Sequence, residues 1–141
     1  MIVVGIDPDS DNHGVAIYSN GTLERLESWD LMTIHSNLES LTGALFSIED
    51  VCANNFVYTR NQKSTKQLMA KMGLSIGRCQ QAQIELMRML DYCGFKVKLH
   101  KPQRGNWSTD KDMFERITGW KGRSNNDTRS AAFFGFLEVR K

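Results

Sequence analysis

Three acidic residues, each next to an apolar segment, are the side chains of this sequence best suited to chemistry: Asp7, Glu49 and Asp127. Asp7 and Glu49 close apolar runs that have the composition of buried strands, and Asp127 falls in the first turn of an expected last helix. Carboxylate oxygens are hard ligands, and the sequence has no cluster of His or Cys to compete with them, which favours Mg²⁺ or Mn²⁺. Two such ions could activate a water molecule and stabilise the leaving oxygen in phosphodiester hydrolysis.

Simpler roles remain open for two of these acids. Asp7 precedes a proline and could start an Asx-turn. Asp127 could be present because a negative charge is favourable at the N-terminus of a helix. The series Asp7, Asp9 and Asp11 is similar to the start of a calcium-binding loop, but an EF-hand requires glutamate at its twelfth position, where this chain has Tyr18. A calcium loop of that type is therefore excluded.

Apolar runs bounded by turn residues predict the strands that position these acids. The expected strands cover residues 2–6, 15–18, 22–29, 45–51 and 95–100. The first three form an antiparallel meander, with a two-residue turn at Asn20-Gly21. Side chains on a strand alternate between its faces, so either Glu49 or Asp50, but not both, can join Asp7. We favour Glu49, with Asp50 as the alternative.

Helical periodicity predicts the remaining elements. Thr33 or Ser36 is the expected cap of a short helix, and the longest periodic segment runs from residue 64 or 65 to about 93. Gly73 and Gly77 weaken that long helix, which indicates close approach by the sheet or by a second subunit. Further helices are expected from residue 108 or 109 to 118 and from about residue 125 onward.

The length of 141 residues fits one domain, residues 1–141, which can bury about two thirds of its unfolded surface without disulfides. Three cysteines without a C-x-x-C pair predict reduced, buried thiols instead of a disulfide framework or a zinc site: Cys52, Cys79 and Cys93. The sequence starts without a basic leader, and no apolar segment approaches the ~20 residues of a membrane span. We therefore expect a cytoplasmic protein with no membrane partner.

Opposite charges are concentrated in the two parts of the sequence. Residues 1–59 contain one basic and nine acidic residues, whereas residues 60–141 contain seventeen basic and seven acidic residues. This separation suggests a cation-binding centre beside a surface for a polyanion such as DNA, although solvated helix faces would give the same composition. The basic residues expected to contact phosphates are Arg60, Lys63, Lys98, Lys101, Arg104, Lys121 and Arg123.

Three motifs in this sequence resemble those of the RuvC-type Holliday junction resolvases, members of the RNase H-like superfamily. GIDPDSDNHGVAIY, residues 5–18, resembles the first signature, in which G-I-D-P is followed by a glycine that opens the second strand. FSIEDV, residues 46–51, resembles the second acidic strand, and NDTRSAAFFGF, residues 126–136, resembles the last-helix signature. The compact size and the NQKS segment are similar to the small phage or prophage branch, for which a bacterial host's cytoplasm is the expected location.

This resemblance implies an α/β, RNase H-like fold with a mixed five-stranded sheet, three antiparallel and two parallel strands, flanked by helices. It also implies a homodimer that nicks four-way DNA junctions symmetrically with two Mg²⁺ ions per site, for which Mn²⁺ can substitute. Asp7, Glu49 and Asp127 match the metal-binding carboxylates by position, and Ser130 occupies the fourth acidic position. Serine is a poor Mg²⁺ ligand, so we expect one metal to be held weakly. Asp9 stands where the family commonly has glycine and adds negative charge at the site.

The loop after Glu49 contains Phe56 and Tyr58, and the resemblance implies an aromatic residue there that stacks at the opened centre of a junction. A core role for one of these rings is the alternative. The predicted function is metal-dependent, structure-selective hydrolysis of branched DNA. A nuclease for RNA–DNA hybrids is an alternative within this fold. The alternative that is not an enzyme is a catalytically silent junction-binding protein, in which Asn126 and Ser130 mark a decayed site.

Overall fold

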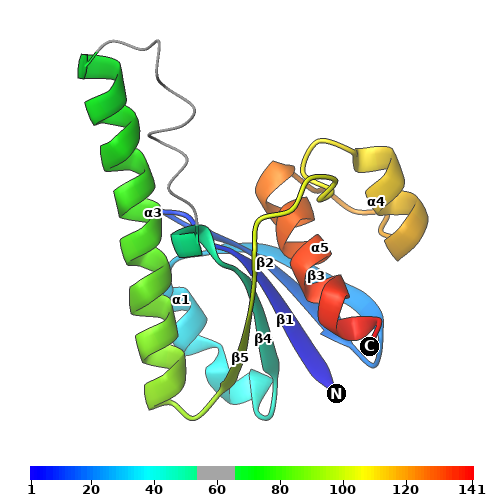
Figure 1. The fold of residues 1–141 in the computed structure, drawn as a ribbon. Coiled ribbons are helices and arrows are strands. Elements are labelled where there is room, and N and C mark those ends of the chain that lie inside the picture. Colours follow the sequence, from blue (N-terminus) through cyan, green and yellow to red (C-terminus); the bar gives the residue numbers. More distant parts are fainter. Residues whose placement is uncertain (54–65) are drawn as a thin grey trace.

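A mixed five-stranded sheet, in the order β3-β2-β1-β4-β5, runs through the computed structural model, which describes residues 1–53 and 66–141 (Figure 1). Its strands are β1 (Ile2–Asp7), β2 (His13–Ser19), β3 (Thr22–Trp29), β4 (Leu45–Glu49) and β5 (Lys96–His100). The first three form an antiparallel meander, and β4 and β5 run parallel to β1. The predicted combination of three antiparallel and two parallel strands is therefore confirmed.

The turn between β2 and β3 shows why these strands pair as they do. Asn20 and Gly21 both have positive φ, 50° and 85°, which is the backbone of the two-residue hairpin turns that match strand twist. Only glycine and a few polar residues such as asparagine adopt this conformation readily. The turn predicted from the Asn-Gly pair is thus confirmed, and it sets the register in which Tyr18 faces Leu23.

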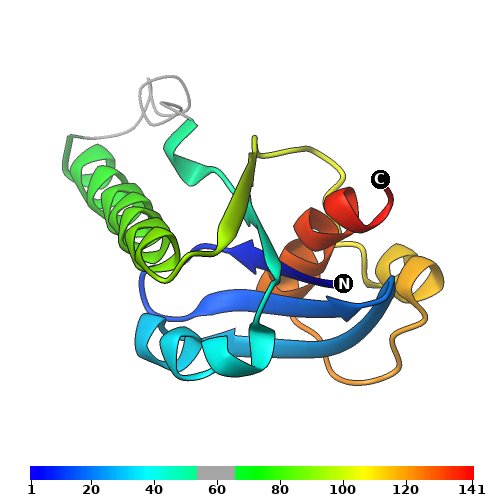
Figure 2. The ribbon, with the colours of Figure 1, turned by 90° about the horizontal axis from the view of Figure 1, so that it is seen from below.

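Helices cover both faces of the sheet (Figure 2). One face carries α1 (Leu31–Ser36), the 3₁₀ turn η1 (Leu38–Leu41) and the long α3 (Lys66–Tyr92), whose residues share a core with Val4, Ile6, Phe46 and Ile48. The other face carries α4 (Lys111–Thr118) and α5 (Asn126–Val139), which enclose a second core with Val3, Ala16 and Trp107. A second 3₁₀ turn, η2 (Val51–Ala53), follows β4. No helix within residues 1–53 and 66–141 is long and apolar enough to cross a membrane.

Helix α5 crosses the sheet in direct contact with β1, at Gly5. A Cβ atom added to Gly5 would lie 2.0 Å from the backbone oxygen of Ala131 and 2.7 Å from the backbone nitrogen of Gly135. The Tyr18 hydroxyl donates a 2.6 Å hydrogen bond to the Ala132 carbonyl, and the Ser47 hydroxyl donates one to the Phe134 carbonyl. These contacts fix α5 relative to β1, β2 and β4, and so fix the position of its first turn.

Gly5→Ala should therefore destabilise the protein, whereas Gly77→Ala should not. Overpacking at the α5 contact is expected to cost about 1–3 kcal/mol, which corresponds to a fall in Tm of roughly 3–10 °C. A Cβ at Gly77 on α3 has no atom of the described residues within 4 Å, so alanine there should gain about 0.5–1 kcal/mol of helix stability. Thermal melts of the two variants test this. Equal destabilisation by both substitutions would contradict the role of Gly5 as a contact point.

Several expectations about the helices and thiols are wrong. The first short helix is capped by Asp30, whose carboxylate accepts a hydrogen bond from the Thr33 backbone N–H at 2.8 Å, and not by Thr33 or Ser36. The sheet does not approach the glycines of α3, because Gly73 and Gly77 both face open space among the described residues. The cysteines are free as predicted, but Cys52 and Cys93 are exposed and Cys79 is half-buried, so the predicted burial is wrong. Cys52 lies on η2 and Cys93 in the turn before β5, whereas Cys79 lies on α3 with its thiol next to the Asp9 carboxylate.

Candidate active site

Asp7 and Glu49 lie side by side at the carboxyl ends of β1 and β4. The pairing of Ile6 with Ile48 aligns the two strands, so the next residue of each strand is a carboxylate on the face covered by α5. Ligands in open α/β sheets commonly bind at the carboxyl ends of the strands. A cavity of about 280 Å³ opens there, lined by Asp7, Pro8, Glu49, Val51, Ser75, Ile76, Cys79 and Pro102.

The Asp7 carboxyl is strongly perturbed by this position. Burial, followed by the negative charges of Glu49 and Asp127, raises the pKa of Asp7 to about 8. Burial also raises the pKa of Glu49, and its hydrogen bond with Asp7 offsets part of that increase. None of the interactions that shift either pKa comes from a basic residue in the described part of the chain. Without a cation, the pair therefore shares one proton at neutral pH.

Asp127 and Asp9 add negative charge beside this pair. Asp127 is in the first turn of α5, and burial followed by the charge of Asp9 raises its pKa. The β1–β2 turn that carries Asp9 is held by His13, whose Nδ1 accepts a hydrogen bond from the Asp9 backbone N–H at 3.2 Å. Burial lowers the pKa of His13, in agreement with a neutral ring that can accept this bond. The expectation that Asp9 adds charge at the site is confirmed.

Ser130 lies against Asp7, three residues after Asp127 on α5. Its side chain is buried, and its hydrogen bond with Asp7 lowers the pKa of that carboxyl, which partly opposes the effect of burial. The residue at the fourth acidic position thus contributes a hydroxyl to the carboxylate pair. Ser130 therefore brings a hydrogen bond to Asp7, where an acidic residue would bring a negative charge.

The first turn of α5 is held in place by two local features. Asn125 caps the helix: its side chain accepts a 2.8 Å hydrogen bond from the Thr128 backbone N–H, and the Thr128 hydroxyl accepts one from the Asn125 backbone N–H at 2.9 Å. Gly14 of β2 lies directly under Asp127, since an added Cβ would be 2.4 Å from the Asp127 backbone oxygen. Asp127 is therefore positioned from both sides, by its own helix cap and by the sheet.

Asp50 does not join the carboxylate pair. Its carboxylate accepts a 3.0 Å hydrogen bond from the side-chain amide of Gln83 on α3, and the same Gln83 accepts one from the Val51 backbone N–H at 2.8 Å. Gln83 is fully buried, and sequence reasoning missed it because a glutamine in a helical pattern gives no signal of a contact made across the fold. Strand alternation thus places Glu49 toward Asp7 and Asp50 toward α3.

The donor atoms around this pair suit a hard divalent cation. Asp7 and Glu49 present carboxylate oxygens that are desolvated and mutually repulsive, and a cation would take the place of their shared proton. Asp127 lies near enough for its charge to raise the pKa of Asp7. Within residues 1–53 and 66–141, however, no three His, Cys, Asp or Glu side chains are already arranged as a metal site. The Asp7–Glu49 pair is therefore the preformed part of the site.

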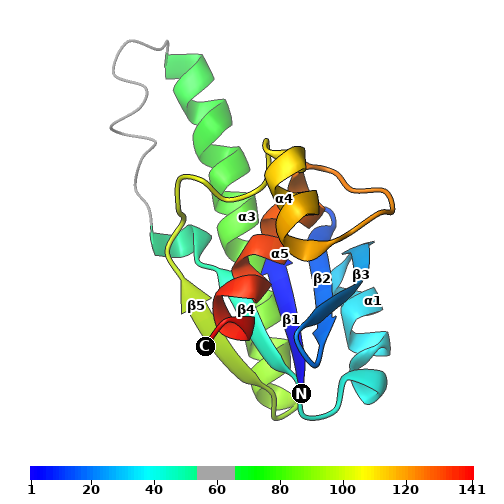
Figure 3. The same ribbon diagram turned by 90° about the vertical axis from the view of Figure 1, so that its right-hand side faces the viewer.

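The residues predicted to bind DNA do not all lie in one region of the structure. Phe56, Tyr58, Arg60 and Lys63 lie outside the described residues. Lys101 directly follows β5, whose last residue pairs with Glu49, so it lies at the carboxylate end of the sheet. Arg104, Lys121 and Arg123 are exposed on the two loops that flank α4 (Figure 3). Lys98 is exposed but lies elsewhere, on a second cleft.

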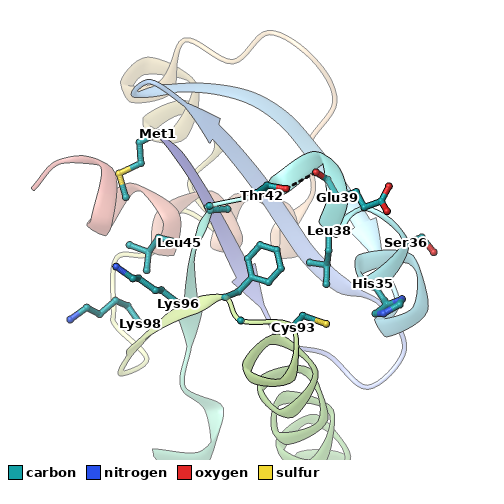
Figure 4. Close-up of a pocket in the computed structure, with 14 residues that line it drawn as sticks. Met1, His35, Ser36, Leu38, Glu39, Thr42, Leu45, Cys93, Lys96 and Lys98 are labelled. Carbon is teal, nitrogen blue, oxygen red and sulfur yellow. Dashed lines mark hydrogen bonds between the residues drawn. The ribbon is translucent and has the colours of Figure 1, made fainter.

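This second cleft is larger and lies at the opposite end of the sheet (Figure 4). Its volume is about 1120 Å³, and its lining includes Met1, which precedes β1, and Leu45, which starts β4, together with Cys93, Lys96 and Lys98. The carboxylate pair is at the other end of those two strands. Although this cleft is the bigger cavity, the acids whose pKa is raised, Asp7, Glu49 and Asp127, lie at or beside the smaller one, which is therefore the candidate active site.

Ser130→Asp should place a third carboxyl group in contact with the Asp7–Glu49 pair. In EDTA we expect the Tm to fall by roughly 3–8 °C, because another negative charge is buried beside Asp7 and Glu49. In excess Mg²⁺ we expect a larger rise in Tm than the wild type shows, since a ligand that binds the folded state stabilises it. Ser130→Asn is the uncharged control. A Mg²⁺ response no larger than that of Ser130→Asn would assign Ser130 to packing alone.

Comparison with known proteins gives matches among solved structures. No family model and no curated protein sequence matches the chain. A structure of Thermus thermophilus RuvC in complex with a Holliday junction substrate aligns with a TM-score of 0.60 and 15% identity, over 96% of this chain and 90% of that one. Fowlpox virus resolvase in complex with substrate Holliday junction DNA aligns with a TM-score of 0.58 and 14% identity, over 98% of each chain. Another Thermus thermophilus RuvC structure aligns at 0.54 and 18%, over 96% and 92%.

These likenesses show that the chain has the RuvC-type, RNase H-like fold. The alignments extend over nearly the full length of both proteins, so the likeness is not confined to one part of the fold. The resemblance noted in the sequence motifs is thereby confirmed at the level of the fold.

Proposed function

We propose that this chain is a metal-dependent, structure-selective endodeoxyribonuclease that resolves four-way or branched DNA junctions. The observation that carries this proposal is the half-buried Asp7–Glu49 pair, in which the pKa of Asp7 is raised to about 8, at the carboxyl ends of β1 and β4. The same fold occurs in two resolvases whose structures contain Holliday junctions. A pair of repelling, desolvated carboxylates has a stability cost, and such costs are concentrated at functional sites.

In this proposal Asp7 and Glu49 hold a divalent cation and Asp127 contributes a further oxygen. Mg²⁺ or Mn²⁺ bound there, as one or two ions, supplies the charge that activates a water molecule and stabilises the leaving oxygen of a phosphodiester. Ser130 orients the Asp7 carboxyl through its hydrogen bond. The capping box at Asn125 keeps the first turn of α5, and with it Asp127, beside the pair. The exposed basic residues of the α4 loops bind the phosphates on either side of the cleaved bond.

The proposal includes a homodimer that makes two symmetric cuts. Resolution of a four-way junction needs a nick in each of two strands, and the described part of the chain contains one carboxylate pair. The outer surface of α3 is available for a second copy, because Leu74 is 57% exposed and Gly77 leaves open space beside it. Sedimentation or light scattering of the free protein measures this state directly. A monomer that cuts both strands would contradict it.

Cleavage of a labelled four-way junction, compared with linear duplex and RNA–DNA hybrid, tests the function. We expect paired nicks in the junction with Mg²⁺ or Mn²⁺, little cleavage of duplex, and none in EDTA. Cleavage of the hybrid in preference to the junction would favour the alternative RNase H-like activity, for which the fold alone leaves room. Tight junction binding without cleavage in either metal would make the protein a silent junction-binding protein.

A further inference from the structure

Arg129 is a buried cation whose side-chain donors bind two segments of the chain, the one around Ser108 and the one from Ser124 to Asn126. Its side chain lies on α5, two residues after Asp127, and the residue is 8% exposed. The Nε and Nη2 atoms donate to the Ser108 carbonyl at 3.2 and 2.9 Å. The Nη1 atom donates to the Ser124 hydroxyl at 2.8 Å, and Nη2 donates to the Asn126 side-chain oxygen at 2.7 Å.

All of these acceptors are uncharged. None of the ion pairs found within residues 1–53 and 66–141 includes Arg129. Burial of a charge is costly unless hydrogen bonds compensate for it, so a guanidinium kept here without a carboxylate partner has another use. A planar fork of donors is suited to holding several acceptors in one fixed geometry, which a lysine ammonium does less well. Arg129 thus forms a hydrogen-bonded joint, by which we mean that its guanidinium links the loop of Ser108 to the loop of Ser124.

The two loops joined by Arg129 carry exposed basic residues. Ser108 belongs to the loop 101–110, which enters α4 and contains Lys101 and Arg104, and Ser124 belongs to the loop 119–125, which leaves α4 and contains Lys121 and Arg123. Figure 3 shows both loops beside α4, next to the first turns of α5. Both therefore meet at the guanidinium, immediately next to the helix turn that holds Asp127.

We propose that Arg129 is a positioning residue that holds these two loops as one phosphate-binding surface aligned with the carboxylate site. This inference rests on the proposed function and assigns its DNA-binding surface to a specific structural element. Arg129 itself is buried, so it acts through Arg104, Lys121 and Arg123. Asp127 has its own supports in the Asn125 cap and the Gly14 contact, so loss of the joint weakens DNA binding and leaves the cleavage step largely unchanged.

Two substitutions at Arg129 separate its hydrogen bonds from its charge. Arg129→Met keeps an apolar stem but removes every donor, and Arg129→Lys keeps the charge but loses the fork. We expect the Kd for a four-way junction to rise about tenfold in Arg129→Met and about threefold or more in Arg129→Lys, because phosphate contacts supply much of nucleic-acid affinity. The single-turnover cleavage rate at saturating protein should stay within about twofold of the wild type. A fall in that rate equal to the loss of affinity would overturn the proposal.

A double-substitution experiment tests whether Arg129 acts through the loop. Lys121→Ala together with Arg123→Ala should weaken junction binding strongly in the wild type but only slightly in the Arg129→Met background, since the loop is already displaced there. Additive effects in the two backgrounds would overturn the proposal, because they would mean that the basic residues bind DNA without the joint.

Limited digestion with trypsin tests the joint without DNA. Cleavage after Lys121 and Arg123 should be several-fold faster in Arg129→Met than in the wild type at a temperature where circular dichroism shows both folded. Ser124→Ala, which removes only one acceptor, should show a smaller increase and serves if Arg129→Met does not fold. Unchanged digestion rates in both Arg129→Met and Ser124→Ala would overturn the proposal that Arg129 holds the loops. If the wild type binds no branched DNA, the proposed function fails, while the digestion pattern still decides whether Arg129 holds the loops.

Discussion

Asp7→Asn is expected to lower cleavage of a four-way junction by roughly 10²- to 10³-fold, with junction affinity unchanged or tighter. The size follows from the loss of a carboxylate at the centre of the site, where removal of one charge-stabilising group commonly costs two to three orders of magnitude. Binding should survive because the exposed basic residues proposed to contact phosphates lie on other segments. Asparagine has nearly the same shape as aspartate, so the fold is retained. Single-turnover cleavage and a gel-shift titration measure the two quantities separately.

The same substitution should stabilise the protein in EDTA. The pKa of Asp7 in the folded state, about 8, is above its value of 3.8 in the unfolded chain. The folded state therefore holds a proton that the unfolded state releases, and the wild type loses stability as the pH rises from about 4 to about 8. Asp7→Asn removes this loss, so its advantage in Tm should grow over that pH range. Mg²⁺ should raise the Tm of the wild type and have little effect on the variant.

Asp50→Asn is the matched control for both experiments. Asp50 is the neighbouring acid of the same segment, but its carboxylate is bound by Gln83 on the other face of the sheet. We expect near-normal cleavage and no gain in stability from this change, whereas Glu49→Gln should behave like Asp7→Asn. Near-normal turnover in Asp7→Asn or Glu49→Gln would exclude the metal assignment. Loss of activity in Asp50→Asn alone would mean that Asp50, and not Glu49, belongs to the catalytic site.

The sequence was sufficient to predict the parts of the fold that depend on local patterns. Residues 22–29 form β3 as expected, the Asn20-Gly21 turn has the predicted backbone, and Gly119 ends α4 in the left-handed conformation. Strand alternation predicted that only one of Glu49 and Asp50 can join Asp7, and the structure places the favoured Glu49 beside Asp7. In each case neighbouring residues in the chain determine the geometry, so the information is present in a short window.

Contacts between distant segments were beyond such reasoning. Arg129 reaches a carbonyl 21 residues earlier in the chain, and Gln83 reaches Asp50 across 33 residues. Neither contact has a periodic pattern, because its partners are brought together by the packing of α5 and α3 on opposite faces of the sheet. The exposure of Cys52 and Cys93 was missed for a related reason: composition indicates that thiols tend to be buried, but not where a given turn lies.

Gly14→Ala is expected to lower the cleavage rate by about 10²-fold without a comparable loss of DNA binding. The added Cβ would lie 2.4 Å from the backbone oxygen of Asp127 and 2.7 Å from its carbonyl carbon, and both are rigid backbone atoms. The first turn of α5 must therefore move away from β2. A displacement of about 1 Å in a group that positions the reaction can cost about 10²-fold in rate.

Gly135→Ala provides the control, because it perturbs the same interface away from the acids. Its Cβ would meet the Tyr18 ring at 2.8 Å and the Gly5 Cα at 3.2 Å, near the middle of α5. Both alanine variants should melt at a lower temperature, since each overpacks the contact between α5 and the sheet. Only Gly14→Ala should lose rate at saturating Mg²⁺ and saturating junction, measured well below either Tm. If Gly135→Ala loses as much rate as Gly14→Ala, then Gly14 supports the stability of α5 in general and does not specifically position Asp127.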